Sequence, residues 1–184
     1  NTEKTGRLLG VSTYTMKTTE QEAESTWKAI YRVIGNANIA INAADNLTWV
    51  GSNDPQETAN EIKRLKGQAY TVRALALFDL LRLYGQQYAG GTLGVPIPLQ
   101  YDPNASSTRA TVAQTEAQIE SDLNRANALF EAIGDVVEQT SSSEKNYISP
   151  LALKAIASRY YLYKGDYAKV AELSEEIKIG RAHV

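Results

Sequence analysis

The 184-residue chain contains no cysteine and a single histidine, His183. Without cysteine, disulfide scaffolds, thiolate nucleophiles and zinc or iron–sulfur sites ligated by Cys are excluded. A serine nucleophile needs a neighbouring base, and the only histidine is the next-to-last residue. No other pattern of metal ligands is present. We therefore expect no metal site, no cofactor and no catalytic residue.

The chain also lacks an excess of positive charge and any long apolar run. Its 19 Lys and Arg against 21 Asp and Glu give a net charge of −2 and a pI near 5.5. Binding to a nucleic-acid backbone needs a basic surface, so nucleic acid is not an expected partner. No segment has the length and apolarity to cross a bilayer, and there is no signal peptide. The sequence begins at Asn1, so we expect any export signal or lipid anchor to precede it.

Capping patterns predict five helices in an all-α fold. Each pattern places a side chain that accepts from the first helical N–H groups ahead of an apolar-periodic run, twice with proline at the first helical position. The predicted helices are 20–46 after Thr19, one from Asp54-Pro55 that includes 64–84, 112–132 after Thr111, 150–163 after Ser149, and 166–178 after Gly165.

The second helix is nearly all apolar from Ala74 to Tyr84, which predicts a central helix wrapped by the other four. Three charged residues interrupt it. Asp79 and Arg82 are three apart and should pair on one face, and Arg73 should lay its stem along Ala76 and Leu77 and reach acceptors at the helix edge. A ligand-binding role for these charges is the alternative.

Two connections lack helical periodicity. Residues 85–110, between the second and third helices, are rich in Gly, Pro and Ser and can hold at most a short extended piece. Residues 134–148 separate the third and fourth helices. Long irregular segments frequently carry binding surfaces, so we expect a ligand surface on these connections.

The last two predicted helices resemble a tetratricopeptide-type hairpin, with Ser158, Tyr161 and Gly165-Asp166-Tyr167 in the expected order. The whole arrangement resembles the SusD/RagB family, the outer-membrane nutrient-binding lipoproteins of Bacteroidetes. Five motifs carry this resemblance in order: Trp27-x3-Tyr31-x2-Ile34-x3-Asn38; GQAYTVRALALFDLLRLYG (67–85); Gly94-Val95-Pro96-Ile97; Arg109-Ala110-Thr111-Val112 with IESDLNRA (119–126); and YLYKGDYAKV (161–170).

The resemblance implies a helical bundle with tetratricopeptide-like hairpins that captures an oligosaccharide or other nutrient and delivers it to a TonB-dependent, SusC-like transporter. It also implies attachment to the cell outer membrane through an N-terminal lipid anchor and exposure at the cell surface. We expect residues 1–178 to be one domain fragment of such a protein. Residues 179–184 match the translation of a sequencing-library adapter, so we expect a non-native tail there.

Tyrosine is the marked excess, with 11 Tyr and 2 Trp against 2 Phe. Tyr and Trp rings pack on the C–H face of a sugar and also supply a hydrogen-bonding group, as they do at protein interfaces. We expect the aromatic residues on helices to pack in the core: Trp27, Tyr31, Tyr70, Tyr84, Tyr160, Tyr161, Tyr163 and Tyr167. The expected ligand-binding residues are those in connections: Tyr14, Trp49, Tyr88 and Tyr101.

Alternatives to glycan binding remain at this stage. The connecting aromatics can instead pack on the core or contact the transporter. A tetratricopeptide-like scaffold for a protein partner is a second class, although the unequal connections do not repeat at the 34-residue period of such arrays. A helical glycosidase is a third class, and it would need two carboxylates facing one another across a pocket.

Overall fold

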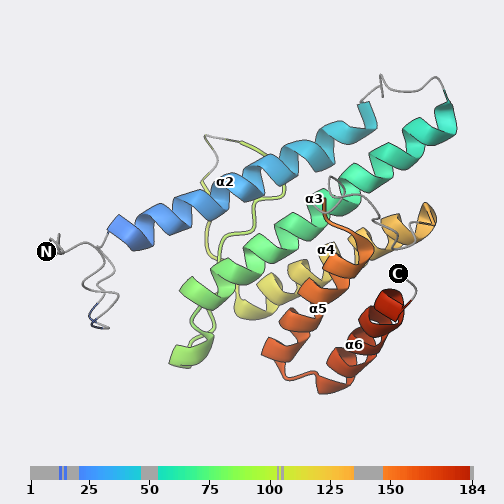
Figure 1. The fold of residues 1–184 in the computed structure, drawn as a ribbon. Helices are drawn as coiled ribbons and strands as arrows, with labels where there is room; N and C mark the ends of the chain where they lie inside the picture. Colours follow the sequence, from blue (N-terminus) through green and yellow to red (C-terminus); the bar gives the residue numbers. More distant parts are fainter. Residues whose placement is uncertain are drawn as a thin grey trace, which may run out of the picture.

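The computed structural model of the chain describes residues 13, 15, 21–46, 54–102, 104, 106–134 and 147–182. Within these ranges the regular elements are helices (Figure 1). They are α2 (Gln21–Ala43), η1 (Ala44–Asn46), α3 (Pro55–Tyr84), η2 (Gln87–Ala89), α4 (Val112–Ala132), α5 (Pro150–Lys164) and α6 (Tyr167–Ala182). One isolated β-bridge also pairs Leu93 with Thr111. The predicted all-α class is confirmed. Only η2 and the last turn of α6 were not foreseen.

The helix starts follow the predicted caps. Asp54 accepts a hydrogen bond from the Gln56 backbone N–H at 2.8 Å, and Ser149 accepts one from Ala152 at 3.2 Å. Thr111 and Gln114 form a reciprocal capping box at the start of α4. Gly165 ends α5 with φ of 77°, a left-handed conformation that glycine adopts without steric cost. Thr19, the predicted first cap, lies outside the described residues.

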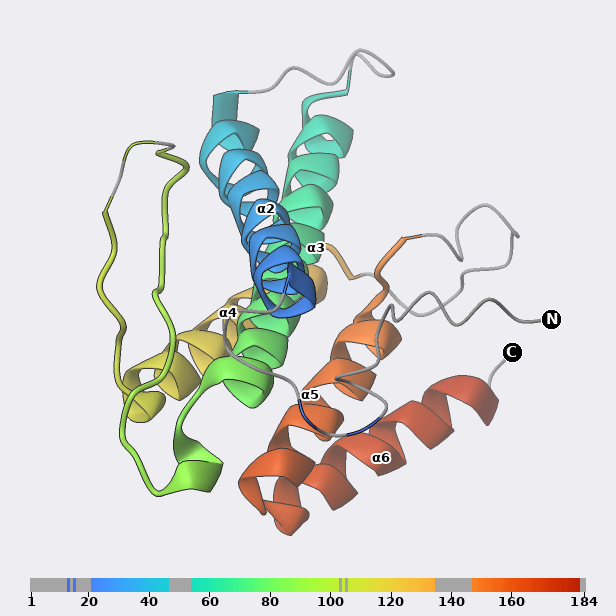
Figure 2. The same ribbon diagram turned by 90° about the vertical axis from the view of Figure 1, so that its left-hand side faces the viewer.

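Helix α3 is the centre of the bundle, with α2 and α4 packed along it and α5 against a third side (Figures 1 and 2). The prediction that all four other helices surround α3 is wrong for α6, which packs on α5 at the outside of the molecule. The hairpin therefore joins the bundle through α5. This arrangement leaves much of α6 at the surface.

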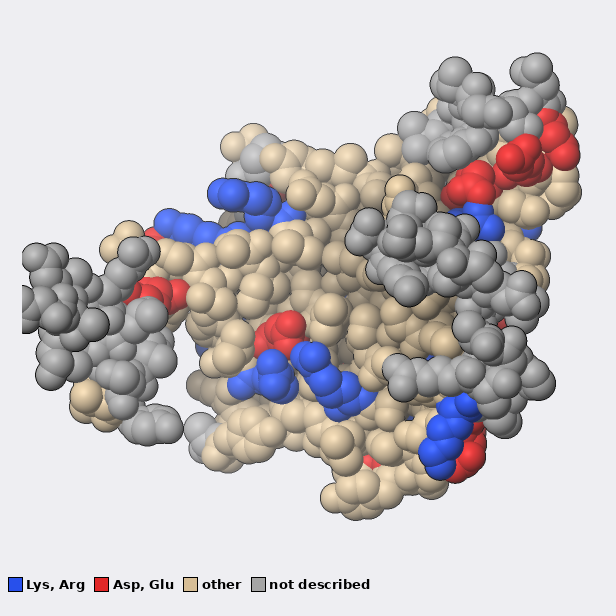
Figure 3. Space-filling model, viewed as in Figure 1, with Lys and Arg blue, Asp and Glu red and all other residues tan. Residues whose placement is uncertain are grey.

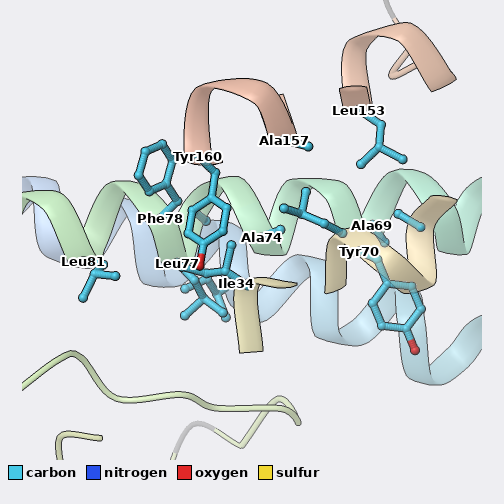
Figure 4. Close-up of a cluster of buried hydrophobic side chains, with 14 of the residues drawn as sticks. Ile34, Ala69, Tyr70, Ala74, Leu77, Phe78, Leu81, Leu153, Ala157 and Tyr160 are labelled. Carbon is cyan, nitrogen blue, oxygen red and sulfur yellow. The ribbon is translucent and has the colours of Figure 1, made fainter. Parts of the chain in front are cut away.

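The core is made mainly by α3 residues that meet the facing sides of α2, α4 and α5 (Figure 4). Burying a Leu, Ile or Phe side chain contributes about 1.5–3 kcal/mol, so this cluster supplies the main driving force for folding. Gly67 brings α3 close to α4, because a Cβ at that position would lie 3.1 Å from the Phe130 ring. The largest fully buried side chains include Ile34, Leu77, Phe78, Leu80, Leu81, Ile119, Phe130 and Tyr160.

Arg73 is buried in the middle of this core, with 3% of its surface exposed. Its Nε and Nη2 donate to the two carboxylate oxygens of Asp122 on α4 at 2.8 and 2.7 Å, and its Nη1 donates to Asn38 Oδ1 on α2 at 2.8 Å. The prediction that Arg73 reaches acceptors at the edge of its own helix is therefore wrong. Its guanidinium instead connects α3 to both neighbouring helices.

Asp79 and Arg82 pair as predicted, with Arg82 Nη2 donating to Asp79 Oδ1 at 2.9 Å. Arg159 of α5 donates to the same carboxylate oxygen at 3.0 Å. Both ion pairs are partly exposed, so unlike Arg73 they lie at the surface of the bundle.

The connection between α3 and α4 runs in extended form along α2 (Figure 2). Three α2 side chains donate to its backbone carbonyl groups: Tyr31 Oη to Pro96 at 2.8 Å, Asn38 Nδ2 to Pro98 at 2.9 Å, and Asn42 Nδ2 to Leu99 at 3.3 Å. Pro96 and Pro98 have no N–H to donate, and the α2 side chains satisfy their carbonyl oxygens and that of Leu99. Tyr31 of the first motif thus holds the Gly94-Val95-Pro96-Ile97 motif in place, and Asn38 holds the residues that follow it.

A short antiparallel contact closes the base of this connection. Gly94 N–H donates to Ala110 O at 2.8 Å, and Val112 N–H donates to Thr92 O at 2.8 Å. Arg109 Nε donates to the Gly94 carbonyl oxygen at 2.8 Å. This pairing stays within the sequence expectation that the connection can hold at most a short extended piece.

Gly94→Ala should destabilise the protein strongly, because the added Cβ would lie 2.3 Å from Thr115 Oγ1 and 2.5 Å from the Thr111 carbonyl oxygen. Forced overpacking of this kind costs about 1–3 kcal/mol. Gly90→Ala is the control, since its Cβ meets nothing within 4 Å and adds only the strain of φ 73°. Urea unfolding measures both variants. A loss for Gly94→Ala no larger than that for Gly90→Ala would contradict the close contact.

Candidate ligand-binding surface

The structure describes two of the four predicted ligand residues, Tyr88 and Tyr101. Tyr14 and Trp49 lie outside the described residues, so their roles stay predictions. Tyr88 is 79% exposed and Tyr101 is 59% exposed, which makes both rings accessible to a ligand. They contact different helices, however: Tyr88 lies beside α5 and Tyr101 beside α2.

Tyr101 lies where the α3–α4 connection passes over α2. A Cβ on Gly35 would be 3.1 Å from Tyr101 Cδ2, so glycine at this position makes room for the ring. One edge of Tyr101 therefore packs on α2 while more than half of the residue stays exposed. Leu99 is also exposed, at 46%. This region is a small apolar surface.

Tyr88 is presented by η2, the single helical turn that follows α3. Backbone bonds from Gln86 N–H to Leu93 O at 2.9 Å and from Gly91 N–H to Gln86 O at 3.0 Å close the loop around this turn. The Tyr88 ring packs edge-on against Tyr163 of α5, with centroids 6.0 Å apart. The loop therefore holds one exposed ring beside a half-buried one.

Tyr163 links this loop to α5, because its hydroxyl donates to Gln87 Oε1. Burial raises the pKa of Tyr163 to about 12, and the neighbouring Tyr88 adds to the shift. The hydroxyl is therefore protonated at neutral pH and able to donate. Its ring also packs edge-on against Phe78 of α3, with centroids 5.3 Å apart.

Two arginines border these rings. The guanidinium carbons of Arg82 and Arg159 lie 5.4 and 5.5 Å from the centre of the Phe78 ring, within the range of cation–π attraction. Asp79 lies between them and accepts from both. Figure 3 shows a small group of red and blue atoms on a largely uncharged face near α3 and α5, consistent with these ion pairs. We call the set Tyr88, Gln87, Tyr163, Arg82, Arg159 and Asp79 the Tyr88 surface.

Tyr163 packs against the core in part, as the sequence predicted, and its partly exposed side also borders the Tyr88 surface. Its spacing of four from Arg159 on a predicted helix was the available signal that the two share a face. The expectation that Tyr167 packs in the core is wrong, since it is 70% exposed on α6. The other aromatics expected to be core residues do pack there, fully or in part: Trp27, Tyr31, Tyr70, Tyr84, Tyr160 and Tyr161.

The groups on this surface are of types that can bind a ligand. Accessible Tyr rings can pack on apolar sugar faces, while amide and guanidinium groups supply hydrogen bonds. Two carboxylates on α4, Glu116 and Glu120, lie close together, but both are bound to Lys164, and Glu120 also accepts from Tyr160. Among the described residues no group of three His, Asp or Glu side chains is placed to hold a metal ion.

Comparisons with known proteins agree with this all-helical architecture. A family model described as "SusD-like_3: Starch-binding associating with outer membrane" matches residues 8–162. The chain belongs to this SusD-like family, which confirms the resemblance found in its motifs. SusD-like protein P2 of Formosa agariphila is 25% identical over 173 residues, covering 91% of this chain and 29% of that protein.

Solved structures share the fold. A SusD superfamily protein from Bacteroides thetaiotaomicron matches with 32% identity and a TM-score of 0.65, over 82% of this chain and 31% of its own. A candidate sugar-binding protein from Bacteroides vulgatus matches with 28% identity and a TM-score of 0.69, over 89% of this chain and 37% of its own. The chain therefore spans about a third of the length of these relatives. None of its described helices is long and apolar enough to cross a membrane.

The buried tyrosines should make the protein lose stability at alkaline pH. Burial raises the pKa values of Tyr31, Tyr160 and Tyr163 in the folded protein, and for Tyr160 the hydrogen bond to Glu120 raises it further. Above pH 10 the unfolded chain loses these protons while the folded protein keeps them, so the free energy of unfolding falls as pH rises.

Tyr160→Phe removes one of these groups. Between pH 9.5 and 11 the free energy of unfolding, measured with urea, should fall in both proteins. The fall should be about 1 kcal/mol smaller in Tyr160→Phe than in the unsubstituted protein. Equal falls in the two proteins would show that the Tyr160 hydroxyl is not protected in the folded state.

Proposed function

We propose that this protein is a non-catalytic glycan-binding component of an outer-membrane uptake system, and that the Tyr88 surface contributes to its ligand site. The single observation that carries the proposal is an exposed Tyr ring fixed beside Tyr163 and two arginines, in a chain of a family described as starch-binding. Tyr88, which folding leaves 79% exposed, loses few protein contacts by packing on a sugar and gains the contact with the sugar.

The Tyr88 surface is ordered by contacts on both sides, which favours binding. Tyr163 is held by Phe78 and Gln87, and the η2 loop is closed by its own backbone bonds. Preorganised groups lose less conformational entropy when a ligand binds. Tyr14, Trp49 and Tyr101 are proposed as further ligand residues, since one stacked ring adds only about 0.5–1.5 kcal/mol beyond its buried area.

Delivery of the bound glycan to a TonB-dependent, SusC-like transporter is part of the proposal, as are a lipid anchor on the full-length protein and exposure at the cell surface. The family description places its members at the outer membrane, which supports this location. The absence of a catalytic role is proposed because the neighbouring carboxylates Glu116 and Glu120 are engaged by Lys164 and Tyr160 instead of facing a substrate.

A protein-binding scaffold is the second candidate. The α5–α6 hairpin resembles a tetratricopeptide-type hairpin in its sequence, and Leu162 and Tyr167 on it are 54% and 70% exposed. Exposed apolar residues of this kind occur at protein interfaces. The two functions differ in which exposed tyrosine contacts the ligand. Tyr88 would contact a glycan, whereas Tyr167 on the α5–α6 hairpin would contact a protein partner.

Tyr88→Ala should weaken binding to the best glycan by about fivefold to tenfold, because a stacking ring is lost. The measurement is calorimetric titration of the full-length protein with a panel of polysaccharides. Tyr101→Ala, measured with the same glycan, tests the second described ring.

Tyr167→Ala is the matched control, since it removes an equally accessible Tyr from α6. Its affinity for the glycan should equal that of the unsubstituted protein. If Tyr88→Ala binds as tightly as Tyr167→Ala, the Tyr88 surface is not part of the glycan site. If no polysaccharide in the panel binds, the proposed function itself fails.

A further inference from the structure

The Tyr88 surface carries more positive than negative charge at one edge. Arg82 and Arg159 both donate to a single oxygen, Asp79 Oδ1, so two guanidinium groups share one carboxylate. Each guanidinium has five N–H donors, and Asp79 takes one from each. The two side chains are 43% and 53% exposed, so donors remain within reach of a ligand.

These arginines are held in place, unlike most surface cations. Both lie over the Phe78 ring, and Asp79 fixes the end of each. A guanidinium whose orientation is fixed loses less side-chain entropy when it binds an anion. Lys164, the nearby cation at the end of α5, is held by Glu116 and Glu120 and so offers no net positive charge.

The arginine pair adjoins the rings proposed to bind sugar. Phe78, which underlies both guanidinium groups, contacts Tyr163, and Tyr163 contacts Tyr88. Arg159 and Tyr163 are four residues apart on α5 and therefore share a face. An oligosaccharide packed on Tyr88 and Tyr163 would have the guanidinium groups beside it.

We propose that the Tyr88 surface selects an acidic oligosaccharide, whose carboxylate or sulfate oxygens accept hydrogen bonds from Arg82 and Arg159. This inference rests on the proposed glycan-binding function and names its substrate class. The planar guanidinium matches the paired oxygens of such groups and binds them more strongly than it binds neutral hydroxyls. Asp79 then competes with the ligand for the same donors.

The test compares matched acidic and neutral polysaccharides on the full-length protein. Polygalacturonate with its carboxyl-reduced form tests carboxylate, and dextran sulfate with dextran tests sulfate. We expect the acidic member of at least one pair to bind about fivefold or more tightly, with the difference shrinking as salt is raised. If no acidic member binds more tightly than its neutral partner, the inference is overturned.

Substitutions at two positions then locate the effect. Arg159→Gln should reduce the ratio of acidic to neutral affinity about threefold, and Arg159→Lys should restore only part of that ratio. Asp79→Asn should strengthen acidic binding, an outcome that a purely structural role for these ion pairs does not give. Lys28→Gln on α2 is the control for loss of an exposed cation elsewhere, and urea unfolding shows that each variant is folded.

Unchanged preference in Arg159→Gln, or weaker acidic binding in a folded Asp79→Asn, would overturn the inference. These results are separable from failure of the proposed function. Equal binding of acidic and neutral glycans removes the selectivity and keeps glycan binding, whereas loss of all binding across the whole panel removes both.

Discussion

The guanidinium of Arg73, buried between three helices, is the interaction on which the rest of the described structure depends. Burying a cation away from water costs free energy unless its N–H donors form hydrogen bonds. Here Asp122 and Asn38 accept three hydrogen bonds from Arg73 at 2.7–2.8 Å. Gln118 adds a bond to the Asp122 carboxylate at 2.9 Å. Apolar packing alone would allow α2, α3 and α4 to shift along one another, but these directional hydrogen bonds allow very little displacement. The network therefore sets the register of the three helices.

Asn38 extends this constraint to the connection that follows α3. Its side-chain oxygen accepts from Arg73 while its amide donates to Pro98 O, so the core network and the extended segment share one residue. Tyr31 holds the same segment at Pro96. The segment returns to α4 through the bridge between Leu93 and Thr111. The loop that presents Tyr88 is thus fixed at one end by α3 and at the other by contacts that lead back to Arg73.

Local features of the sequence predicted much of this fold, because their causes are local. The caps at Asp54, Thr111 and Ser149 and the left-handed Gly165 act within one turn of chain. The partner of Arg73 was missed because Asp122 is 49 residues away. A signal did exist: Asp122 falls three after Ile119 and four before Ala126, on the buried face of α4. A carboxylate at a core position needs a buried cation, and Arg73 was the candidate.

The candidate site was less predictable for a related reason. Exposure of an aromatic residue on a helix depends on what packs over it, and the sequence pattern of α5 and α6 does not show that. Tyr160 and Tyr167 were given the same expectation, yet α3 and α4 cover Tyr160 completely while Tyr167 is exposed on the outer helix. Tyr88 and Tyr101 were predicted to bind a ligand because they lie in a connection, where no helical packing accounts for them, and both are exposed in the structure.

The most direct test of the central claim is the free energy of unfolding of Asp122→Asn, measured with urea beside Glu24→Gln, which removes a carboxylate from an exposed pair on α2. Asp122→Asn keeps the shape of the side chain and leaves the Arg73 charge buried without its partner. The account predicts a loss of about 3–5 kcal/mol for Asp122→Asn and no measurable loss for Glu24→Gln. A loss for Asp122→Asn as small as that for Glu24→Gln would contradict it.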